Sequence, residues 1–371
     1  MNFSKTNKVI IRSTFIAVLF GAAFLAGCDN SSGGSQKAGI PEGALVIQKQ
    51  GIFSSGGTVT EPLPGKYDET KNWLDLTRAG NTAHVDHANV MYQIPANDNG
   101  HPIVYLHGYG QSRMGWMTTF DGREGWSEIF LRKGYAAFLV DQPRRGEAGA
   151  SVHMPNVGGI DAGGTDGKMY LPGDQAWFTH GRIGRIAPEP YEGSQFPKGE
   201  EALNQYYRQG TPNTGDYDEK LFGSVLGDVI KDVRRITGNK AIYVTHSQGG
   251  RVGLQTPVEN ISAIVAIEPG FAPNVGSEEY KKLLDAKIPI VFYFGDYIEN
   301  GPKDIESTTF WQNVLAQCKQ FAEAYTKDGG DATVIELPKI GIKGNSHSMF
   351  QEMNNKEIAD HIEKWLESKG L

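Results

Sequence analysis

Residues 243–253 read YVTHSQGGRVG. An apolar, strand-like sequence runs into Ser247, which stands between a histidine and a glutamine and is followed by two glycines. A serine nucleophile on a tight strand-to-helix turn needs small neighbours where the two backbones pass closely, and Gly249 and Gly250 supply them. Thr245, however, occupies the place of the first glycine in the usual pattern. The stretch alone therefore leaves two interpretations open, a nucleophile or an ordinary turn residue.

Apolar runs alternate with helical patterns from residue 102 to the end of the chain. The runs are nearly continuous, as in strands buried on both faces of a parallel sheet. Six such alternations predict an α/β fold, with a mostly parallel, doubly wound sheet flanked by helices. The runs are PIVYLHG (102–108), YAAFLVD (135–141), KAIYVTHS (240–247), ISAIVAIEP (261–269), IPIVFYFGD (288–296) and ATVIELP (332–338).

Two regions depart from this alternation. Residues 84–95, HVDHANVMYQIP, alternate with a period of two and predict one strand, in which His84 and His87 would point to opposite faces and so make a poor metal chelate. Residues 147–218, hereafter the insertion, are rich in Gly, Pro and aromatic residues without a clear period. We expect the insertion to lie over the active-site face of a domain spanning residues 44–371, as a cap.

The first 43 residues are expected to precede the fold. Residues 1–27 have a basic start and an apolar core of about a dozen residues, too short to span a bilayer, which predicts a signal peptide. The segment LAGC that ends at Cys28 resembles the bacterial lipobox, which implies a lipid on Cys28 and a place in the cell envelope. The alternative is a signal peptide cut elsewhere, which also means export. Residues 28–43 read as a flexible tether.

The charge and cysteine content indicate which binding partners and which disulfides to expect. The 371-residue chain carries a formal net charge of −7, and loss of the three basic residues in 1–27 would bring it to about −10. Without a basic run, nucleic acid is not an expected partner, and a small molecule is favoured. Cys28 and Cys318 are the only cysteines, so a lipidated Cys28 leaves no disulfide. Cys318 falls on the apolar face of a helical pattern and is expected to be buried.

A serine nucleophile needs oxyanion donors and a base. The first donor would be the backbone N–H of Gln248, and the second that of Tyr109, in the glycine-containing loop after the 102–108 run. His347 follows the last strand, at the edge of the sheet where ligands bind in such folds, and is the candidate base. His361 lies inside the final helical pattern and is a poor rival.

The acid that would orient His347 has two candidates. Glu268 and Asp296 each follow a predicted strand, and each preserves the chain order serine, acid, histidine. The longer side chain of Glu268 would help it reach the histidine from the nearer strand. The residues themselves leave both open.

Taken together, these motifs resemble the α/β-hydrolase fold superfamily. The resemblance is carried by HGYG (107–110), DQPRRGEAGAS (141–151), THSQGG (245–250) and GNSH (344–347). More narrowly, the chain is similar to secreted bacterial esterases whose acid is a glutamate after the strand that follows the nucleophile strand. That resemblance implies Ser247 as nucleophile, His347 as base, Glu268 as acid, and the Tyr109 and Gln248 amides as oxyanion donors. It implies no metal or organic cofactor.

The predicted function is that of a serine hydrolase acting on a small carboxylic ester through an acyl-enzyme. An amidase or an acyltransferase would use the same residues. A different class, a catalytically inactive, lipid-anchored binding protein of the same fold, is the other alternative. The aromatic residues of segment 170–207 suit either a pocket for an apolar substrate group or a small core of the cap itself. They are Trp177, Phe178, Tyr191, Phe196, Tyr206 and Tyr207.

Overall fold

The computed structural model describes most of the chain after its N-terminal region. The described residues are 40–70, 79–152, 171 and 173–371. The predicted signal peptide (1–27), Cys28 and the tether as far as residue 39 therefore lie outside the described residues. The insertion is described in part, up to residue 152 and again at 171 and from 173 onward.

The chain divides into two units, Met1–Ala44 and Leu45–Leu371. In the first unit, Ala44 N–H donates a hydrogen bond to the Pro41 carbonyl at 3.1 Å. The second unit holds the helices and strands described below. Within the described ranges, no helix combines the length and the apolar character that crossing a membrane requires.

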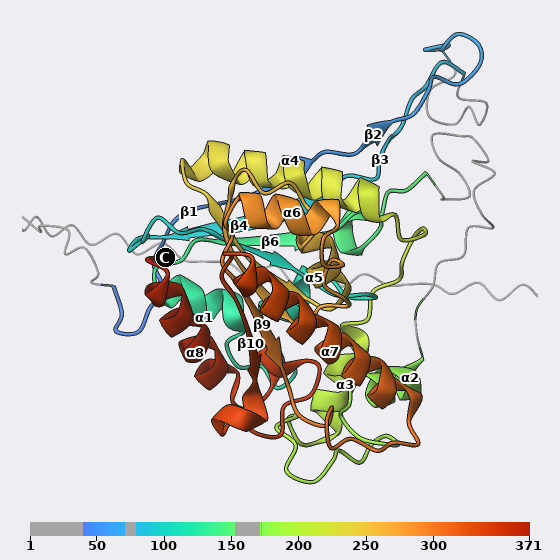
Figure 1. The fold of residues 1–371 in the computed structure, drawn as a ribbon. Helices are drawn as coiled ribbons and strands as arrows, with labels where there is room; N and C mark the ends of the chain where they lie inside the picture. Colours follow the sequence, from blue (N-terminus) through green and yellow to red (C-terminus); the bar gives the residue numbers. More distant parts are fainter. Residues whose placement is uncertain (1–39, 71–78, 153–170, 172) are drawn as a thin grey trace, which may run out of the picture. The chain divides into compact units, whose positions relative to one another are not determined.

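An eight-stranded sheet forms the centre of the second unit (Figure 1). Its strands are β1 (Ile47–Ser55), β4 (Ala88–Pro95), β5 (Ile103–Leu106), β6 (Ala137–Asp141), β7 (Ala241–His246), β8 (Ile261–Ile267), β9 (Ile290–Phe294) and β10 (Ala332–Glu336). They lie in the order β1-β4-β6-β5-β7-β8-β9-β10. Strand β4 runs against both β1 and β6, and the pairs from β6 to β10 are parallel. This confirms the predicted mostly parallel, doubly wound sheet.

The prediction of one continuous strand over residues 84–95 is wrong. The chain forms β3 (His84–Val85), which pairs with β2 (Thr58–Val59) in a separate two-stranded sheet, and then β4 in the main sheet. The break falls at Asp86, whose φ of 56° is incompatible with a strand. The buried carboxylate of Asp86 binds the Arg144 guanidinium through two hydrogen bonds of 2.9 and 3.0 Å. That buried ion pair overrides the local alternation.

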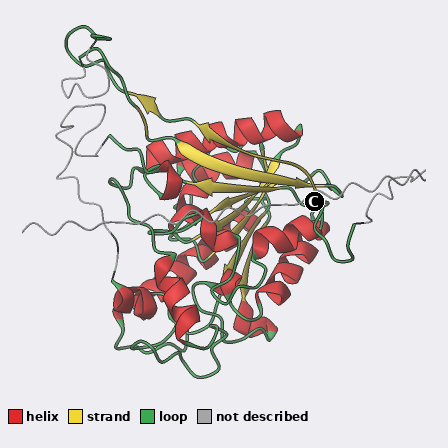
Figure 2. Ribbon diagram, turned by 180° about the vertical axis from the view of Figure 1, so that it is seen from behind, coloured by secondary structure: helices red, strands yellow, loops and turns green. Residues whose placement is uncertain are grey.

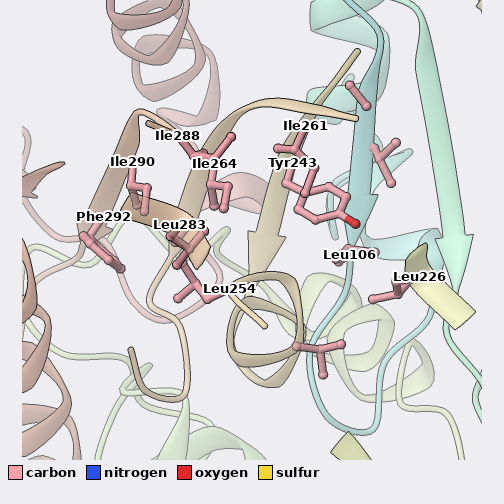
Figure 3. Packing of buried hydrophobic residues seen from close by; sticks show 14 of the residues in the cluster. Leu106, Leu226, Tyr243, Leu254, Ile261, Ile264, Leu283, Ile288, Ile290 and Phe292 are labelled. Atoms are coloured by element: carbon pink, nitrogen blue, oxygen red, sulfur yellow. The ribbon is translucent and has the colours of Figure 1, made fainter. Parts of the chain in front are cut away.

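Helices cover both faces of the sheet (Figure 2). On one face, four helices bury apolar side chains against the strands in a single cluster, part of which Figure 3 shows around Tyr243, Ile264 and Leu254. On the other face, two helices pack in a second cluster. The first set is α4 (Glu219–Thr237), α5 (Gln248–Gly253), α6 (Glu278–Asp285) and α7 (Glu306–Lys327), and the second is α1 (Trp126–Arg132) and α8 (Asn355–Ser368).

The helical spacing of apolar residues explains why each of these helices buries one side against the sheet. In α7, Trp311, Cys318 and Tyr325 are fully or almost fully buried on one side, so the expectation for Cys318 is confirmed. Burial also raises the pKa of the Cys318 thiol. In the described insertion two further helices occur, α2 (Asp174–His180) and α3 (Glu200–Arg208). Short 3₁₀ helices lie at Arg113–Trp116, Gly146–Ala148, Leu337–Ile340 and Met349–Gln351.

Candidate active site

Ser247 forms the turn between β7 and α5. Its backbone has φ 52° and ψ −123°, a conformation that residues other than glycine rarely adopt and that costs about 1–3 kcal/mol. The end of β8 holds this backbone in place: Ser247 N–H donates to the Ile267 carbonyl at 3.1 Å, and Gly270 N–H donates to the Ser247 carbonyl at 2.8 Å. The side chain is therefore presented at the carboxyl edge of the sheet on a strained, well-anchored turn.

Three glycines of α5 allow the helix to approach the strands. A Cβ atom on Gly250 would lie 2.6 Å from Pro269 Cβ, and one on Gly249 would collide with the carbonyl oxygen of His107. A Cβ on Gly253 would lie 2.9 Å from Thr245 Cγ2. The glycine at position 253 thus makes room for the threonine that replaces the first glycine of the usual motif. Thr245 is fully buried, and its hydroxyl has no hydrogen-bond partner among the described residues.

His347 and Glu268 meet at the same edge of the sheet. Glu268 directly follows β8, and the last residue of β8, Ile267, pairs with His246 at the end of β7. His347 lies after β10, in residues 341–354, which are called the histidine loop below. His347 Nδ1 lies 2.6 Å from Glu268 Oε2, and both side chains are buried. In the described part of the chain, no hydrogen bond joins Ser247 Oγ to His347.

Asp296, the other candidate acid, makes different contacts. Its carboxylate accepts hydrogen bonds from Tyr297 N–H at 2.9 Å and from Gly344 N–H at 3.1 Å. Its own N–H donates to the Asn345 carbonyl at 2.7 Å. Asp296 therefore shapes the histidine loop through backbone groups, while Glu268 contacts the imidazole.

The loop after β5, residues 107–111, lies against Ser247. A Cβ atom on Gly108 would be 2.9 Å from Ser247 Cβ, so the loop that carries Tyr109 approaches the turn that Gln248 follows. Gln111 Oε1 accepts the Gly108 N–H at 3.0 Å and fixes the bend of the loop. The structure thus brings the five residues singled out in the sequence to one edge of the sheet.

Comparison with known proteins agrees with this arrangement. No family model matches the chain. A solved structure described as a novel bacterial esterase is 30% identical, with a TM-score of 0.74 over 90% of this chain and 100% of that chain. The chain belongs to the esterases of the α/β-hydrolase superfamily. A probable secreted lipase of a fungus (Fungal sp., strain ATCC 74256) is 27% identical, over 72% of this chain and 82% of that protein.

The electrostatics of this esterase keep His347 neutral. Burial lowers the pKa of His347 well below its usual value, and the charges of Arg182 and His180 lower the pKa further. A neutral imidazole whose Nδ1 faces a carboxylate carries its hydrogen on Nδ1, which leaves Nε2 as a proton acceptor. The His246 ring lies beside it at a tilt of 45°, with ring centroids 4.2 Å apart, and His246 Nε2 faces the His347 carbonyl at 2.9 Å.

Arg182 is a site residue of the esterase that sequence reasoning missed. It belongs to the insertion, and its Nη2 lies 2.5 Å from Glu268 Oε1. The surrounding stretch has neither a regular period nor a known motif, and the contact spans 86 positions, so no local signal points to it. His361, the rejected rival for the base, instead contacts the Tyr293 hydroxyl through Nδ1 at 2.8 Å.

The aromatic segment of the insertion forms a small core of the cap, and part of it also lines a cavity. Phe178, Phe196 and Tyr206 are buried in a small cluster of the cap. Phe178 and Phe196, together with Tyr191, also line a cavity of about 860 Å³. Gln195, between the lining residues Ser194 and Phe196, connects this segment to the histidine loop, because its N–H donates to the Gly344 carbonyl at 2.7 Å. The esterase thus carries a cavity in its insertion, lined by aromatic and charged side chains.

Proposed function

We propose that the chain hydrolyses carboxylic esters through Ser247, His347 and Glu268. The observation that carries the proposal is the 2.6 Å contact between His347 Nδ1 and Glu268 Oε2, beside a serine held on a strained turn. Membership of an esterase family supports the reaction class. Asp296 is the less suitable acid, because its carboxylate is occupied by the Tyr297 and Gly344 amides.

In this mechanism, Ser247 Oγ attacks the ester carbonyl carbon while His347 Nε2 accepts the hydroxyl proton. The backbone N–H groups of Tyr109 and Gln248 stabilise the oxyanion that forms. His347 then gives its proton to the departing alkoxide, and the acyl group stays on Ser247. Water, deprotonated by His347, attacks the acyl-enzyme; His347 then returns this proton to Ser247 Oγ as the acid leaves. Glu268 holds the Nδ1 hydrogen and stabilises the imidazolium in both half-reactions.

The test is replacement of the nucleophile. Ser247→Ala should lower kcat for a short-chain p-nitrophenyl ester by about 10⁴-fold or more, with the melting temperature unchanged. Ser368→Ala, at the exposed end of α8, is the control and should hydrolyse the ester as the wild type does. A fluorophosphonate should label the wild type and not the Ser247 variant. Full activity of Ser247→Ala would refute the mechanism, and an unlabelled, inactive wild type would favour a binding protein.

We also propose that the enzyme is exported and held at a bacterial membrane by a lipid on Cys28. The support is the LAGC segment behind a basic and apolar leader. A similar fungal protein is named as secreted, which accords with export.

A further inference from the structure

The guanidinium of Arg182 is buried beside Glu268. Its Nη2 lies 2.5 Å from Glu268 Oε1, and its Nε donates to the Asp296 carbonyl at 3.1 Å. The two side chains are 2% and 0% exposed. A carboxylate removed from water to this degree requires a counter-charge and hydrogen bonds. Arg182 supplies the counter-charge from the insertion, outside the strand loops that carry the other site residues.

The contacts of Glu268 divide between its two carboxylate oxygens. Oε1 accepts hydrogen bonds from Arg182 Nη2 and from Gly295 N–H, the latter at 2.8 Å. Oε2 faces His347 Nδ1 at 2.6 Å. With Oε1 bound from two directions, the plane of the carboxylate is fixed, and Oε2 has one position from which to hold the imidazole.

We propose that Arg182 is a positioning residue, which holds Glu268 so that Oε2 faces His347 and thereby keeps the imidazole in place beside Ser247. The inference rests on the mechanism proposed above and adds a role for the insertion in it. Arg182 acts through Glu268 and does not touch the reacting atoms.

The backbone around Arg182 fixes the position of its guanidinium. Arg182 has φ 58°, and its N–H donates to the Thr179 carbonyl at 3.1 Å. The preceding Gly181 carbonyl accepts His347 N–H at 3.0 Å, so the insertion binds the histidine loop next to the same ion pair. The guanidinium also lies over the Trp311 ring, 5.2 Å from its centroid. A lysine would retain the charge but not this planar, directional set of contacts.

The charge of Arg182 also acts on His347. Burial is the main cause that lowers the pKa of His347, and Arg182 and His180 lower it further. Loss of the Arg182 charge should therefore raise the pKa of His347 and move the acidic limb of the rate profile to higher pH. The groups around His347 are His180 and Arg182 of the insertion, His246 at the end of β7, Glu268 after β8, Asp296 after β9 and Glu352 in the histidine loop.

The experiment measures kcat and KM for a p-nitrophenyl ester from pH 4 to 9 in the full-length chain, so that the acidic limb falls inside the range. Arg182→Lys should lower kcat about 100-fold, with KM within about twofold and the acidic limb unmoved, because the charge stays while the geometry is lost. Arg182→Met should lower kcat at least as much and shift the acidic limb to higher pH. Arg185→Met, three residues away in an exposed ion pair with Asp304, should keep the wild-type profile.

Two outcomes separate the inference from the mechanism on which it rests. If Ser247→Ala is inactive but both Arg182 variants keep wild-type kcat and the wild-type acidic limb, the inference on Arg182 is wrong and the mechanism stands. If Ser247→Ala is active, the mechanism itself fails. Should Arg182→Met not fold, the lysine variant decides: a fall in kcat at constant KM supports positioning, and an unchanged kcat overturns it.

Discussion

Positive φ values occur at Ser247 and Glu268 of the proposed mechanism and at Arg182, which contacts Glu268. Ser247, Glu268 and Arg182 have φ values of 52°, 40° and 58°, in a region that costs a side-chain-bearing residue about 1–3 kcal/mol. Each is held by a neighbouring backbone: Ser247 N–H binds the Ile267 carbonyl, and Glu268 N–H binds the Tyr293 carbonyl at 2.9 Å. Such conformations persist only where the surrounding structure fixes them. The contacts at the strand ends therefore offset the conformational strain of these residues.

The buried hydroxyl of Thr245 predicts a stabilising substitution. Thr245→Val keeps the methyl group that packs at Gly253 and removes an oxygen that has no hydrogen-bond partner among the described residues. We expect the free energy of unfolding to rise by about 1 kcal/mol, measured by urea denaturation. Thr256→Val is the matched control, because its hydroxyl donates to the Val252 carbonyl at 2.9 Å, and it should destabilise by a similar amount. An equal decrease in the free energy of unfolding for both variants would contradict this explanation.

At the scale of the element, the glycines of α5 let this helix pack closely against the strand ends. Gly250→Ala would place a Cβ 2.6 Å from Pro269 Cβ and 2.9 Å from Pro269 Cα. The helix must then move away from the strand ends and carry Ser247 with it. We expect kcat to fall about 100-fold and the melting temperature to drop.

The control for that substitution lies in α4. Gly223 is also a buried helical glycine, but an added Cβ would meet nothing closer than the Gln255 carbonyl at 3.9 Å. Gly223→Ala should therefore raise the free energy of unfolding by about 1 kcal/mol, with kcat unchanged. If the two alanine variants behaved alike, close approach would not be the reason for Gly250.

The elements themselves were predictable where burial alone decides them. Every apolar run from residue 102 onward became a strand, and all of these strands except β10, at the edge of the sheet, are almost fully buried. The strand predicted over 84–95 failed at Asp86, because an ion pair with Arg144, 58 positions away, leaves no trace in the local pattern. Helices α2 and α3 were not predicted because they are short and lie in the insertion, where the sequence has no clear period.

At the scale of the whole molecule, the candidate site gathers residues from five distant parts of the chain. Ser247, His347, Glu268 and the Tyr109 loop could be found in the sequence because their chemistry and their places after strands follow a rule of the fold. Arg182 could not, because it enters from the irregular insertion and is recognised only by its contact with Glu268. The sequence also left Glu268 and Asp296 open, and the 2.6 Å contact with His347 favours Glu268.

The proposed anchor gives a prediction for the whole chain in its cell. After loss of residues 1–27 the net charge is about −10, so an anionic lipid surface would repel the domain, and a lipid on Cys28 would have to hold it. Cys28→Ser should move the ester hydrolase activity from the membrane fraction to the soluble fraction, with kcat unchanged. Cys318→Ala, which alters the buried cysteine of α7, should leave the activity in the membrane fraction. A Cys28→Ser enzyme that sediments with the membranes as the wild type does would rule out the lipid as its anchor.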